Sequence, residues 1–483
     1  MWWAGARVSW WIQRPAPSWA EPTPGATGTR WAGEGVPFLR IGATQRTGAV
    51  FKLALPATAE LLLNMVVDMV NTYLVGHLGA ASLAGVGLAS QWVMTAMVLF
   101  SAVGTGATAL IARLVGARDW PMANRVLGQA LAISFAIGLG TAGALWLGAE
   151  PALRLLGAEE EAITQGVPYL RLVSSVFMFS ALMFIGNACL RGAGDTRTPL
   201  LVMTVVNLLN LGLSWPLVNG HWGLPRLGVE GAAVGAMVGR LAGGLLVMVL
   251  LLRGRTGLIL RARGWRFDPA LSWRMLRIGL PAALEQFVFR MGMLAFVRTV
   301  SALGTVSYAA HQVALNAESI SFMPGFGFAV AATTLVGQGL GAKDPRRAEQ
   351  DGFAAFYLAA GLMSIMGLGF IFFAPQLMGV FTEDPQIIEL GTTPLRLIGL
   401  AQPFLAAMMV FGGGLRGAGE TTAPLLINGL GVWVVRVPAA LVFTRVFVWG
   451  LTGAWIAMAI DLTSRGLLLF FRFRSGQWKK VQV

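Results

Sequence analysis

Charged residues are scarce in this chain. Of its 483 residues, only 12% are Asp, Glu, Lys or Arg and 56% are hydrophobic, whereas about a quarter of the residues in an average soluble domain are charged. This composition excludes a water-soluble globule with a charged surface. The apolar runs are long enough to cross a bilayer, which takes about 20 helical residues. The 62 glycines suit membrane helices that pack closely.

Side chains that bind metals or act as nucleophiles are also few. The single cysteine, Cys189, excludes an internal disulfide framework and a four-cysteine metal site. The three histidines, His77, His221 and His311, show no metal-ligand spacing, and the chain has neither a nucleophile elbow nor a G-x-x-x-x-G-K-[ST] phosphate loop. We therefore predict no enzyme activity and no cofactor. An ATP-driven pump is excluded, so a transporter of this sequence would be driven by an ion gradient.

The formal charge of +14 does not indicate a nucleic-acid partner. Its basic residues lie between the apolar runs, where the positive-inside rule places them. The first 45 residues hold five prolines and no apolar run of the length found in a secretory signal. We expect residues 1–47 to form a disordered cytoplasmic tail. An over-long start and a transit peptide are the alternatives.

A six-residue motif occurs twice in the chain. "RGAGDT" occupies residues 191–196 and "RGAGET" occupies residues 416–421, an offset of 225 positions. Further matches at the same offset, given next, form a series in one register that does not arise by chance. The chain is therefore a tandem duplication that is evident from about residue 56 to 201. The same offset maps Pro56-Ala57 onto Pro281-Ala282, Glu60 onto Glu285, and Leu78-Gly79 onto Leu303-Gly304.

Twelve apolar runs divide into two sets of six. We predict all of them to be helices, because backbone polar groups in lipid must be paired within their own segment. The predicted fold class is therefore an all-α integral membrane protein with 12 transmembrane helices in two six-helix lobes. The predicted spans are 50–76, 81–108, 126–147, 168–190, 198–218 and 228–252, then 278–302, 307–336, 352–374, 391–414, 422–444 and 450–471.

Arginine and lysine gather in alternate loops and predict the orientation. The loops after even-numbered spans and the tails are rich in them, whereas the opposite loops hold only Arg154, Arg226 and Arg445. Both termini are therefore predicted to be cytoplasmic. With six spans each, the two units enter from the same side and form a parallel repeat.

These features divide the chain into five predicted parts. They are a tail (1–47), a first lobe (48–252), a cytoplasmic amphipathic linker (253–277), a second lobe (278–471) and a cytoplasmic tail (472–483). In the linker, arginines alternate with apolar residues, which is typical of an interfacial segment. Asp268-Pro269 predicts a helix start.

Each copy of the doubled motif lies between the fourth and fifth span of its unit. Its glycines allow a tight connection, and Asp195 or Glu420 can cap the following helix. We expect the arginine to lie at the level of the lipid headgroups. We interpret the motif as a structural turn rather than as a substrate contact.

Polar residues form a stripe in the first span. Glu60, Asn64, Asp68 and Asn71 are spaced by four, four and three residues, so they share one helix face. A carboxylate at mid-bilayer costs about 2.5–3.5 kcal/mol and is a functional candidate by default. We predict that the stripe lines a cavity and that Asp68 is an ion or proton site. The alternative is a hydrogen-bonded helix contact.

Further polar residues lie in other spans. Glu285 and Glu318 are candidate ion-coupling groups, although either could pair with Arg290 and would then be structural. A single buried histidine such as His311 can equally be an interior residue with satisfied hydrogen bonds. The additional cavity candidates are Asn187, Asn207, Asn210, Gln286, His311, Gln312 and Asn316.

From about residue 48 to 475, the chain resembles the multidrug and toxic compound extrusion (MATE) family. The resemblance rests on the Pro-Ala near the first helix of each unit, the two LRG-x-G-[DE]-T turns, and "FMPGFGFAVAATTLVGQ" at 322–338. It implies two V-shaped lobes, a central cavity, and antiport of organic, often cationic, compounds against H⁺ or Na⁺. It also implies a monomer in the plasma membrane, with membrane lipids as partners.

The resemblance has departures that affect the coupling site. Asn71 stands where the family usually has its first-helix aspartate, and Asp68 lies one turn earlier. Ser214 replaces the second aspartate that one branch has in helix five. In this interpretation Glu285 shares or takes over the coupling role.

A flippase for lipid-linked precursors is the alternative function, from the same superfold. Such a protein would need a cavity lined by positive charge. The intramembrane arginines that favour it are Arg240, Arg290, Arg298 and Arg436.

Overall fold

Each predicted span corresponds to a helix, or a run of joined helices, in the computed structural model. The structure describes residues 42–254, 257–260 and 267–481, and all regular elements in these ranges are helical. Residues 44–483 form one unit by their internal contacts. The predicted tail up to residue 41 and parts of the predicted linker lie outside the described residues.

The first repeat contains eight described helices. The fourth predicted span is the pair α5 and α6, which bend by 56° around Val176. The short α4 was not predicted and lies between the third and fourth spans. The bounds are α1 (Gly42–Gly76), α2 (Ala80–Gly116), α3 (Trp120–Leu147), α4 (Ala149–Leu155), α5 (Glu160–Ser175), α6 (Phe177–Gly192), α7 (Arg197–Asn219) and α8 (Val229–Arg253).

The second repeat follows the same order. Its fifth span is a continuous run of α-helix and π-helix from Thr422 to Val446. The bounds are α9 (Pro269–Ser301), α10 (Thr305–Gly341), α11 (Pro345–Phe372), α12 (Ala374–Gly379), α13 (Pro385–Gly417), α14 (Thr422–Leu430), η1 (Gly431–Arg436), α15 (Val437–Leu441), η2 (Val442–Val446), α16 (Gly450–Arg474) and the 3₁₀ turn η3 (Gln477–Lys480).

Among the described residues, eleven helices are long and apolar enough to cross a membrane, and the bent pair α5–α6 makes twelve if it is counted as one span. The all-helical fold class predicted above is therefore confirmed.

An Asp-capped start with proline in the first two positions recurs in four helices. Asp268 is the N-cap of α9 and accepts hydrogen bonds from the backbone N–H groups of Ala270 and Leu271. This confirms the helix start predicted at Asp268-Pro269. Asp119, Asp344 and Asp384 cap α3, α11 and α13 in the same way. The carboxylate satisfies an otherwise unpaired N–H, and proline has no N–H to satisfy there.

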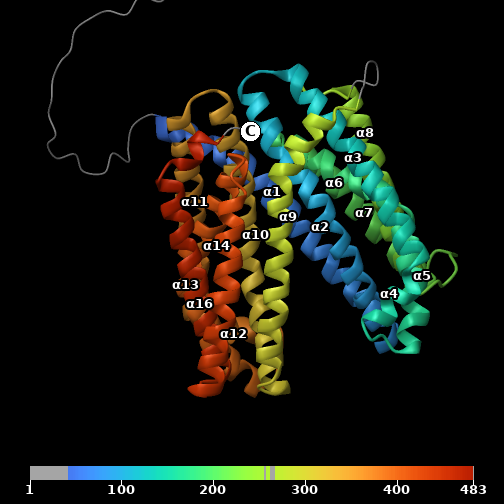
Figure 1. Cartoon of the computed structure of the whole chain (residues 1–483). Coiled ribbons are helices and arrows are strands. Elements are labelled where there is room, and N and C mark those ends of the chain that lie inside the picture. The colour runs from blue at the N-terminus through green and yellow to red at the C-terminus, as the bar shows by residue number, and fades with distance from the viewer. Residues whose placement is uncertain (1–41, 255–256, 261–266, 482–483) are drawn as a thin grey trace, which may run out of the picture. The chain divides into compact units, whose positions relative to one another are not determined.

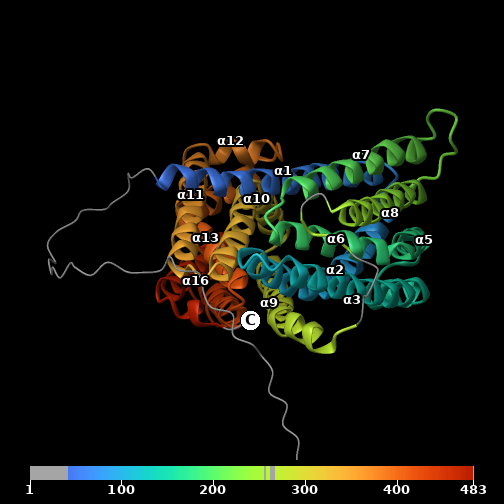
Figure 2. The ribbon, with the colours of Figure 1, turned by 90° about the horizontal axis from the view of Figure 1, so that it is seen from above.

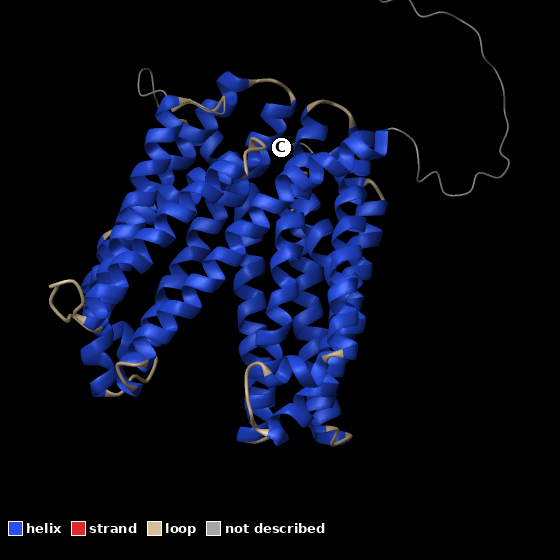
Figure 3. Cartoon of the chain, turned by 180° about the vertical axis from the view of Figure 1, so that it is seen from behind, coloured by secondary structure: helices blue, strands red, loops and turns tan. Residues whose placement is uncertain are grey.

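The helices of residues 44–483 pack as two bundles, each with its own buried core (Figure 1). The first core lies mainly among α2, α3, α5, α6 and α8, and the second among α10, α11, α13 and α16. The bundles approach at the end where both ends of the described chain lie. They diverge toward the end that carries α4 and α12, as the view from behind also shows (Figure 3).

The first helix of each repeat begins in the bundle of the other repeat. Val50 and Leu53 of α1 belong to the second core, whereas Met275 and Ile278 of α9 belong to the first. Seen from above, α1 runs past α10 and continues beside α7 (Figure 2). Each predicted lobe is therefore completed by a few turns from its partner.

Glycines bring α2 and α10 into close contact where the bundles approach. A Cβ atom on Gly116 would overlap the carbonyl oxygen of Gln338, and one on Gly341 would overlap that of Arg113. The two glycines are related by the same offset of 225 positions as the doubled motif. Close backbone approach of this kind needs residues without a side chain.

Candidate functional site

The arginine of each doubled motif forms an ion pair with the glutamate of its own repeat's first helix. Arg191 Nη1 lies 3.0 Å from Glu60 Oε1, and Arg416 Nη1 lies 3.0 Å from Glu285 Oε1. Only 9% of the Glu60 side chain and 10% of the Glu285 side chain are exposed. The arginines thus turn onto α1 and α9, and each is the ion-pair partner of a buried glutamate.

Arg290 is not the partner of Glu285. Its Nη2 donates a hydrogen bond of 2.6 Å to Oε1 of Gln91 on α2. The pairing with Arg290 that we considered from the sequence is therefore wrong for Glu285, whose described ion-pair partner is Arg416.

The one difference between the two motifs has a structural consequence. Asp195 accepts hydrogen bonds of 3.0 Å from the backbone N–H groups of Arg197 and Thr198 and so caps α7, as predicted. Glu420 is one methylene longer and instead accepts a bond of 2.8 Å from Nε of Arg472 on α16. The expectation that Glu420 caps the next helix is therefore not met.

A chain of hydrogen bonds extends from Glu285 into the second bundle. Asn428 Nδ2 donates to Glu285 Oε1 at 2.6 Å, and Arg465 Nη1 donates to Asn428 Oδ1 at 3.4 Å. Asp461 Oδ2 then accepts from Arg465 Nη2 at 2.6 Å and from Arg436 Nε at 2.8 Å. The side chains of Arg436, Asp461 and Arg465 are at most 3% exposed. Buried charges of this kind are stable only when paired.

The π-helical segment η1 positions Arg436 in this hydrogen-bonded network of side chains. Pro438, two residues further on, lacks a backbone N–H and crowds the preceding turn, so the helix widens here rather than continuing as a regular α-helix. Gly431, the first residue of η1, allows a close approach, because a Cβ there would overlap the side chain of Arg465. The wide turn therefore brings Arg436 to Asp461.

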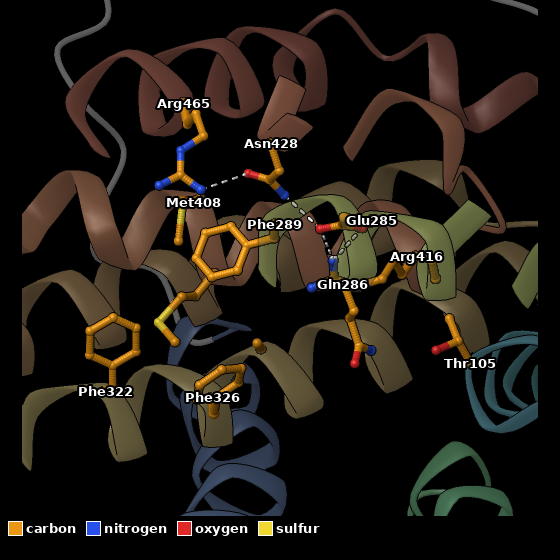
Figure 4. A pocket seen from close by; sticks show the side chains of 13 residues that line it. Thr105, Glu285, Gln286, Phe289, Phe322, Phe326, Met408, Arg416, Asn428 and Arg465 are labelled. Carbon is orange, nitrogen blue, oxygen red and sulfur yellow. Dashed lines mark hydrogen bonds and ion pairs between the residues drawn. The ribbon is translucent and has the colours of Figure 1, made fainter. Parts of the chain in front are cut away.

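A cavity of about 370 Å³ lies beside the hydrogen-bonded network of Glu285, Asn428 and Arg465 (Figure 4). It is bounded mainly by helices of the second repeat, with Thr105 contributed by α2. The polar wall consists of Glu285, Gln286, Arg416, Asn428 and Arg465. The apolar wall includes Phe289, Phe322, Phe326, Met408 and Met409.

Two of the predicted site residues, Glu285 and Gln286, line this cavity. The polar stripe of α1 lies elsewhere. Asn64 accepts a hydrogen bond of 2.8 Å from Asn207 of α7, which is the helix contact considered as its alternative role. Asp68 is exposed on α1 and interacts electrostatically with Arg240.

Three other asparagines of the first repeat were cavity candidates. Asn210 accepts a hydrogen bond of 3.1 Å from Ser214 on the same helix. The amide oxygens of Asn71 and Asn187 are buried, with no hydrogen-bond partner among the described residues. These residues do not line the cavity of Figure 4.

The predicted residues of α10 divide into buried and exposed ones. His311 is fully buried and its Nδ1 accepts a hydrogen bond of 3.2 Å from Trp455 Nε1, whereas its Nε2 has no hydrogen-bond partner among the described residues. Glu318 is also fully buried, and neither of its oxygens has a hydrogen-bond partner among the described residues. Gln312 and Asn316 are exposed, and Gln312 donates to the Tyr308 hydroxyl at 3.0 Å.

Sequence reasoning missed Arg416, Asn428 and Arg465. A signal for Arg416 was present, because Glu60 and Arg191 have the same sequence separation, 131, as Glu285 and Arg416. A duplicated acid and a duplicated base at one shared spacing indicate a duplicated pair. Arg465 lies four residues after Asp461, a spacing that favours an ion pair on one helix face.

A small cluster of charged residues lies at the end of the first bundle where the two bundles diverge. Arg154 on α4 pairs with Glu150 and Glu160 at 3.1 and 3.0 Å. Hydrogen bonds to Glu150 and then to Glu160 raise the pKa of Arg154. One of the few basic residues of this end is thus neutralised locally. Among the described residues, no group of three His, Cys, Asp or Glu side chains could hold a metal ion.

The MatE family model matches residues 56–215 and 281–442, one match in each repeat. The chain belongs to the MatE family. It is 36% identical over 444 residues to the "Probable multidrug resistance protein NorM" of Thermotoga maritima, covering 90% of this chain and 93% of that protein. It is 30% identical over 429 residues to the protein of the same name from Burkholderia mallei, covering 87% and 91%.

Solved structures show the same fold. One is described as the "Outward-facing conformation of a multidrug resistance MATE family transporter of the MOP superfamily" and matches with a TM-score of 0.84 and 24% identity, over 90% of this chain and 97% of the other. Another, "Crystal structure of MATE in the bent conformation", matches with a TM-score of 0.83 and 24% identity over the same shares. This MATE protein is therefore a multi-pass membrane protein of a transporter family.

Proposed function

We propose that this MATE protein is a multidrug efflux antiporter, which exports small organic compounds in exchange for H⁺ or Na⁺. The names of its relatives and its family membership support export of small compounds. The observation that carries the coupling proposal is the position of Glu285. Its carboxylate is nearly buried, lies in the cavity wall, and is held by Arg416 and Asn428.

Glu285 can couple ion binding to substrate transport because the ion competes with Arg416 for the negative charge of the carboxylate. When H⁺ or Na⁺ binds the carboxylate, the attraction to Arg416 weakens, and the chain through Asn428 to Arg465 is perturbed. An interaction that differs between two states of a protein shifts the balance between them. In a transporter built from parallel repeats, the two states interconvert by rocking of one bundle against the other.

We also propose coupling roles for Asp68 and Glu318. Asp68 interacts electrostatically with Arg240 in the first repeat, and Glu318 is a buried carboxylate without a hydrogen-bond partner among the described residues. Both are acidic groups within spans, where ionisable residues are functional candidates.

The coupling proposal is tested in proteoliposomes by imposing a pH gradient and then a sodium gradient separately. We expect one of the two gradients to drive uptake of a fluorescent substrate such as ethidium or norfloxacin into the proteoliposomes. The Glu285→Gln variant should lose gradient-driven transport. The matched variant Glu60→Gln removes the equivalent pair of the first repeat, outside the cavity, and should retain it. Transport by Glu285→Gln at the wild-type rate would refute this role of Glu285.

We place the end that carries the basic loops and both described chain ends in the cytoplasm, for a monomer in the plasma membrane. The excess of arginine and lysine in these loops supports this orientation. Reporter fusions after Glu160 and after Arg261 should report outside and inside, respectively. The reverse pattern would overturn the orientation.

The flippase alternative loses two of the four arginines that favoured it. Arg436 is neutralised by Asp461, and Arg290 donates to Gln91. Neither arginine lines the cavity of Figure 4. Accumulation of lipid-linked precursors in cells that lack the protein would favour the alternative.

A further inference from the structure

The chain folds back onto the second bundle after α16. This α16 extension, residues 475–481, includes η3 and turns at Gly476, whose φ of 68° is left-handed and therefore suits glycine. Trp478 is fully buried, and its ring stacks on that of Phe473 with centroids 4.7 Å apart. Its Nε1 donates to the Phe473 carbonyl at 2.6 Å. The buried tryptophan thus fixes the extension on the bundle, in the core cluster that also holds Ala418.

Charged side chains hold the extension at two further points. Lys479 Nζ lies 2.6 Å from Glu349 Oε2 on α11. Arg472 of α16 donates to Gln477 in the extension and, from its Nε at 2.8 Å, to Glu420 of the doubled motif. Partly exposed ion pairs of this kind add little stability singly. The buried tryptophan is therefore the main anchor, and the charged side chains orient the extension around it.

The extension also contacts the first bundle. Arg113 lies in the last turn of α2, and its Nη2 donates to the carbonyl of Val481 at 2.8 Å and to that of Ala418 at 2.7 Å. One guanidinium of the first bundle thus binds two carbonyls of the second, and such charge-assisted bonds are stronger than neutral ones. The contact lies where the bundles approach (Figure 1), beside the close backbone contacts at Gly116 and Gly341.

The first repeat has its own equivalent of the extension. After α8, Leu258 is fully buried in the first core, and the backbone N–H of Ile259 donates to Asn124 Oδ1 at 2.8 Å. The offset of 225 positions relates Asn124 to Glu349. Each repeat therefore holds the chain after its last long helix at the same position of its third span. Folding back onto the bundle is a property of the repeat.

The link from this segment to the other bundle differs between the repeats. The offset of 225 positions relates Arg113 to Gln338, which donates to the carbonyl of Gly192 at 3.3 Å. In the part of the chain that the structure describes, Gln338 makes no hydrogen bond to the segment after α8. Glutamine is the shorter side chain and carries no charge. The second repeat thus adds a link that the duplication alone does not provide.

We propose that the α16 extension is a clasp, which Arg113 closes and which holds the two bundles together at this end. When the bundles part here, Arg113 must leave both carbonyls. An interaction made in only one of two states shifts the balance toward that state, so the clasp favours the state in which this end is closed. The proposal rests on the proposed function, because rocking of the bundles is the motion that the clasp opposes.

Distances between two spin labels, measured by double electron–electron resonance on the full chain in lipid nanodiscs, test the proposal. The labels are attached at Arg197→Cys and Thr422→Cys. These exposed positions begin α7 and α14, one in each bundle, and are related by the offset of 225 positions. The natural Cys189 is fully buried and stays unlabelled. Parting of the bundles at this end lengthens the distance between the labels.

Arg113→Gln gives the first repeat the residue that the second has at the equivalent position. The glutamine can still donate to Ala418, as Gln338 does to Gly192, but loses the charge-assisted bond to Val481. We expect the ratio of long-distance to short-distance populations to rise about tenfold, since bonds to charged groups are among the stronger ones. Arg118→Gln removes an exposed arginine at the same end and should leave the ratio unchanged.

Trp478→Ala removes the anchor of the extension and should shift the ratio in the same direction. The double variant Arg113→Gln/Trp478→Ala should shift it no further than the larger of the two single variants, because both break one contact. Additive shifts would contradict the clasp, since the two residues would then act independently. If Trp478→Ala does not fold, Arg113→Gln decides alone. A distance distribution for Arg113→Gln equal to that of Arg118→Gln would overturn the proposal.

The outcomes separate the clasp from the proposed function. An unchanged distance distribution in Arg113→Gln, together with gradient-driven export, would remove the clasp and leave the antiporter. A shifted distribution, in a protein that exports nothing under either gradient, would remove the antiporter and leave the clasp.

Discussion

The two repeats share one ion pair but differ in what surrounds it. Glu60–Arg191 and Glu285–Arg416 have the same sequence separation and the same N–O distance of 3.0 Å. Near the first pair, Asn207 donates to Asn64. The second pair instead continues through Asn428 into the buried charges of α16 and η1. The pair itself is thus a property of the repeat, whereas the extended network described here lies in the second repeat and its cavity is lined mainly by that repeat.

The contact between the bundles differs from the extended network, because both repeats contribute equivalent side chains to it. Arg113 Nη2 donates to the carbonyl of Ala418 at 2.7 Å, and Gln338 Nε2 donates to that of Gly192 at 3.3 Å. Each side chain reaches the doubled motif of the other repeat. The motif therefore has two structural roles, as the base of an ion pair and as an acceptor between bundles.

The largest expected effect comes from breaking the hydrogen-bonded network that extends from Glu285 to Arg436 in the second repeat. Asp461→Asn removes the carboxylate shared by Arg436 and Arg465 and leaves two buried arginines without a counter-charge. Removal of one partner of a buried pair costs about 3–5 kcal/mol, so the thermal midpoint of the purified protein should fall strongly. Glu230→Gln changes an exposed acid of α8 and is the control. A midpoint for Asp461→Asn equal to that of the control would show that the network does not stabilise the fold.

A smaller effect should appear equally in both repeats. Gly341→Ala places a methyl group against the carbonyl of Arg113, and Gly116→Ala places one against that of Gln338. Overpacking of this kind costs about 1–3 kcal/mol. Gly361→Ala in α11, where a Cβ would meet no atom within 4 Å, is the matched control. Midpoints of unfolding should fall for both interface variants and not for the control, and a fall in only one would contradict the symmetry of the contact.

The smallest effect on stability is expected at Asp68. This side chain is exposed on α1 and has no counterpart in the second repeat, where the offset of 225 positions leads to Met293. Substitutions at exposed positions usually change stability by less than about 0.5 kcal/mol. Asp68→Asn should therefore fold normally and still lose ion-coupled export. Well-expressed Asp68→Asn protein with wild-type export would remove Asp68 from the coupling mechanism.

The sequence predicted the spans better than the site. Apolar runs of membrane length have few structural alternatives, so every span was located. The bend at Val176 and the π-helix before Pro438 were not predicted, because such distortions depend on the packing of neighbouring helices as well as on local residues.

The cavity was predicted only in part. In the polar stripe of α1, Asn64 contacts Asn207 and Glu60 contacts Arg191, whereas Asp68 is exposed. The stripe did not indicate which bundle would hold the cavity. Arg465 and Asn428 are 37 residues apart, and nothing in their local sequence relates them.

The sequence by itself determined a duplicated, all-helical membrane protein, because hydrophobic length and repeat register are properties of the chain. It also contained the two acid–base pairs, as equal spacings within the duplication. Only the tertiary structure decided which arginines enter the interior, because the direction of a long side chain depends on the partner that its neighbours place within reach. The charge of the cavity was decided in the same way, by the helices α9, α13, α14 and α16 converging on one wall.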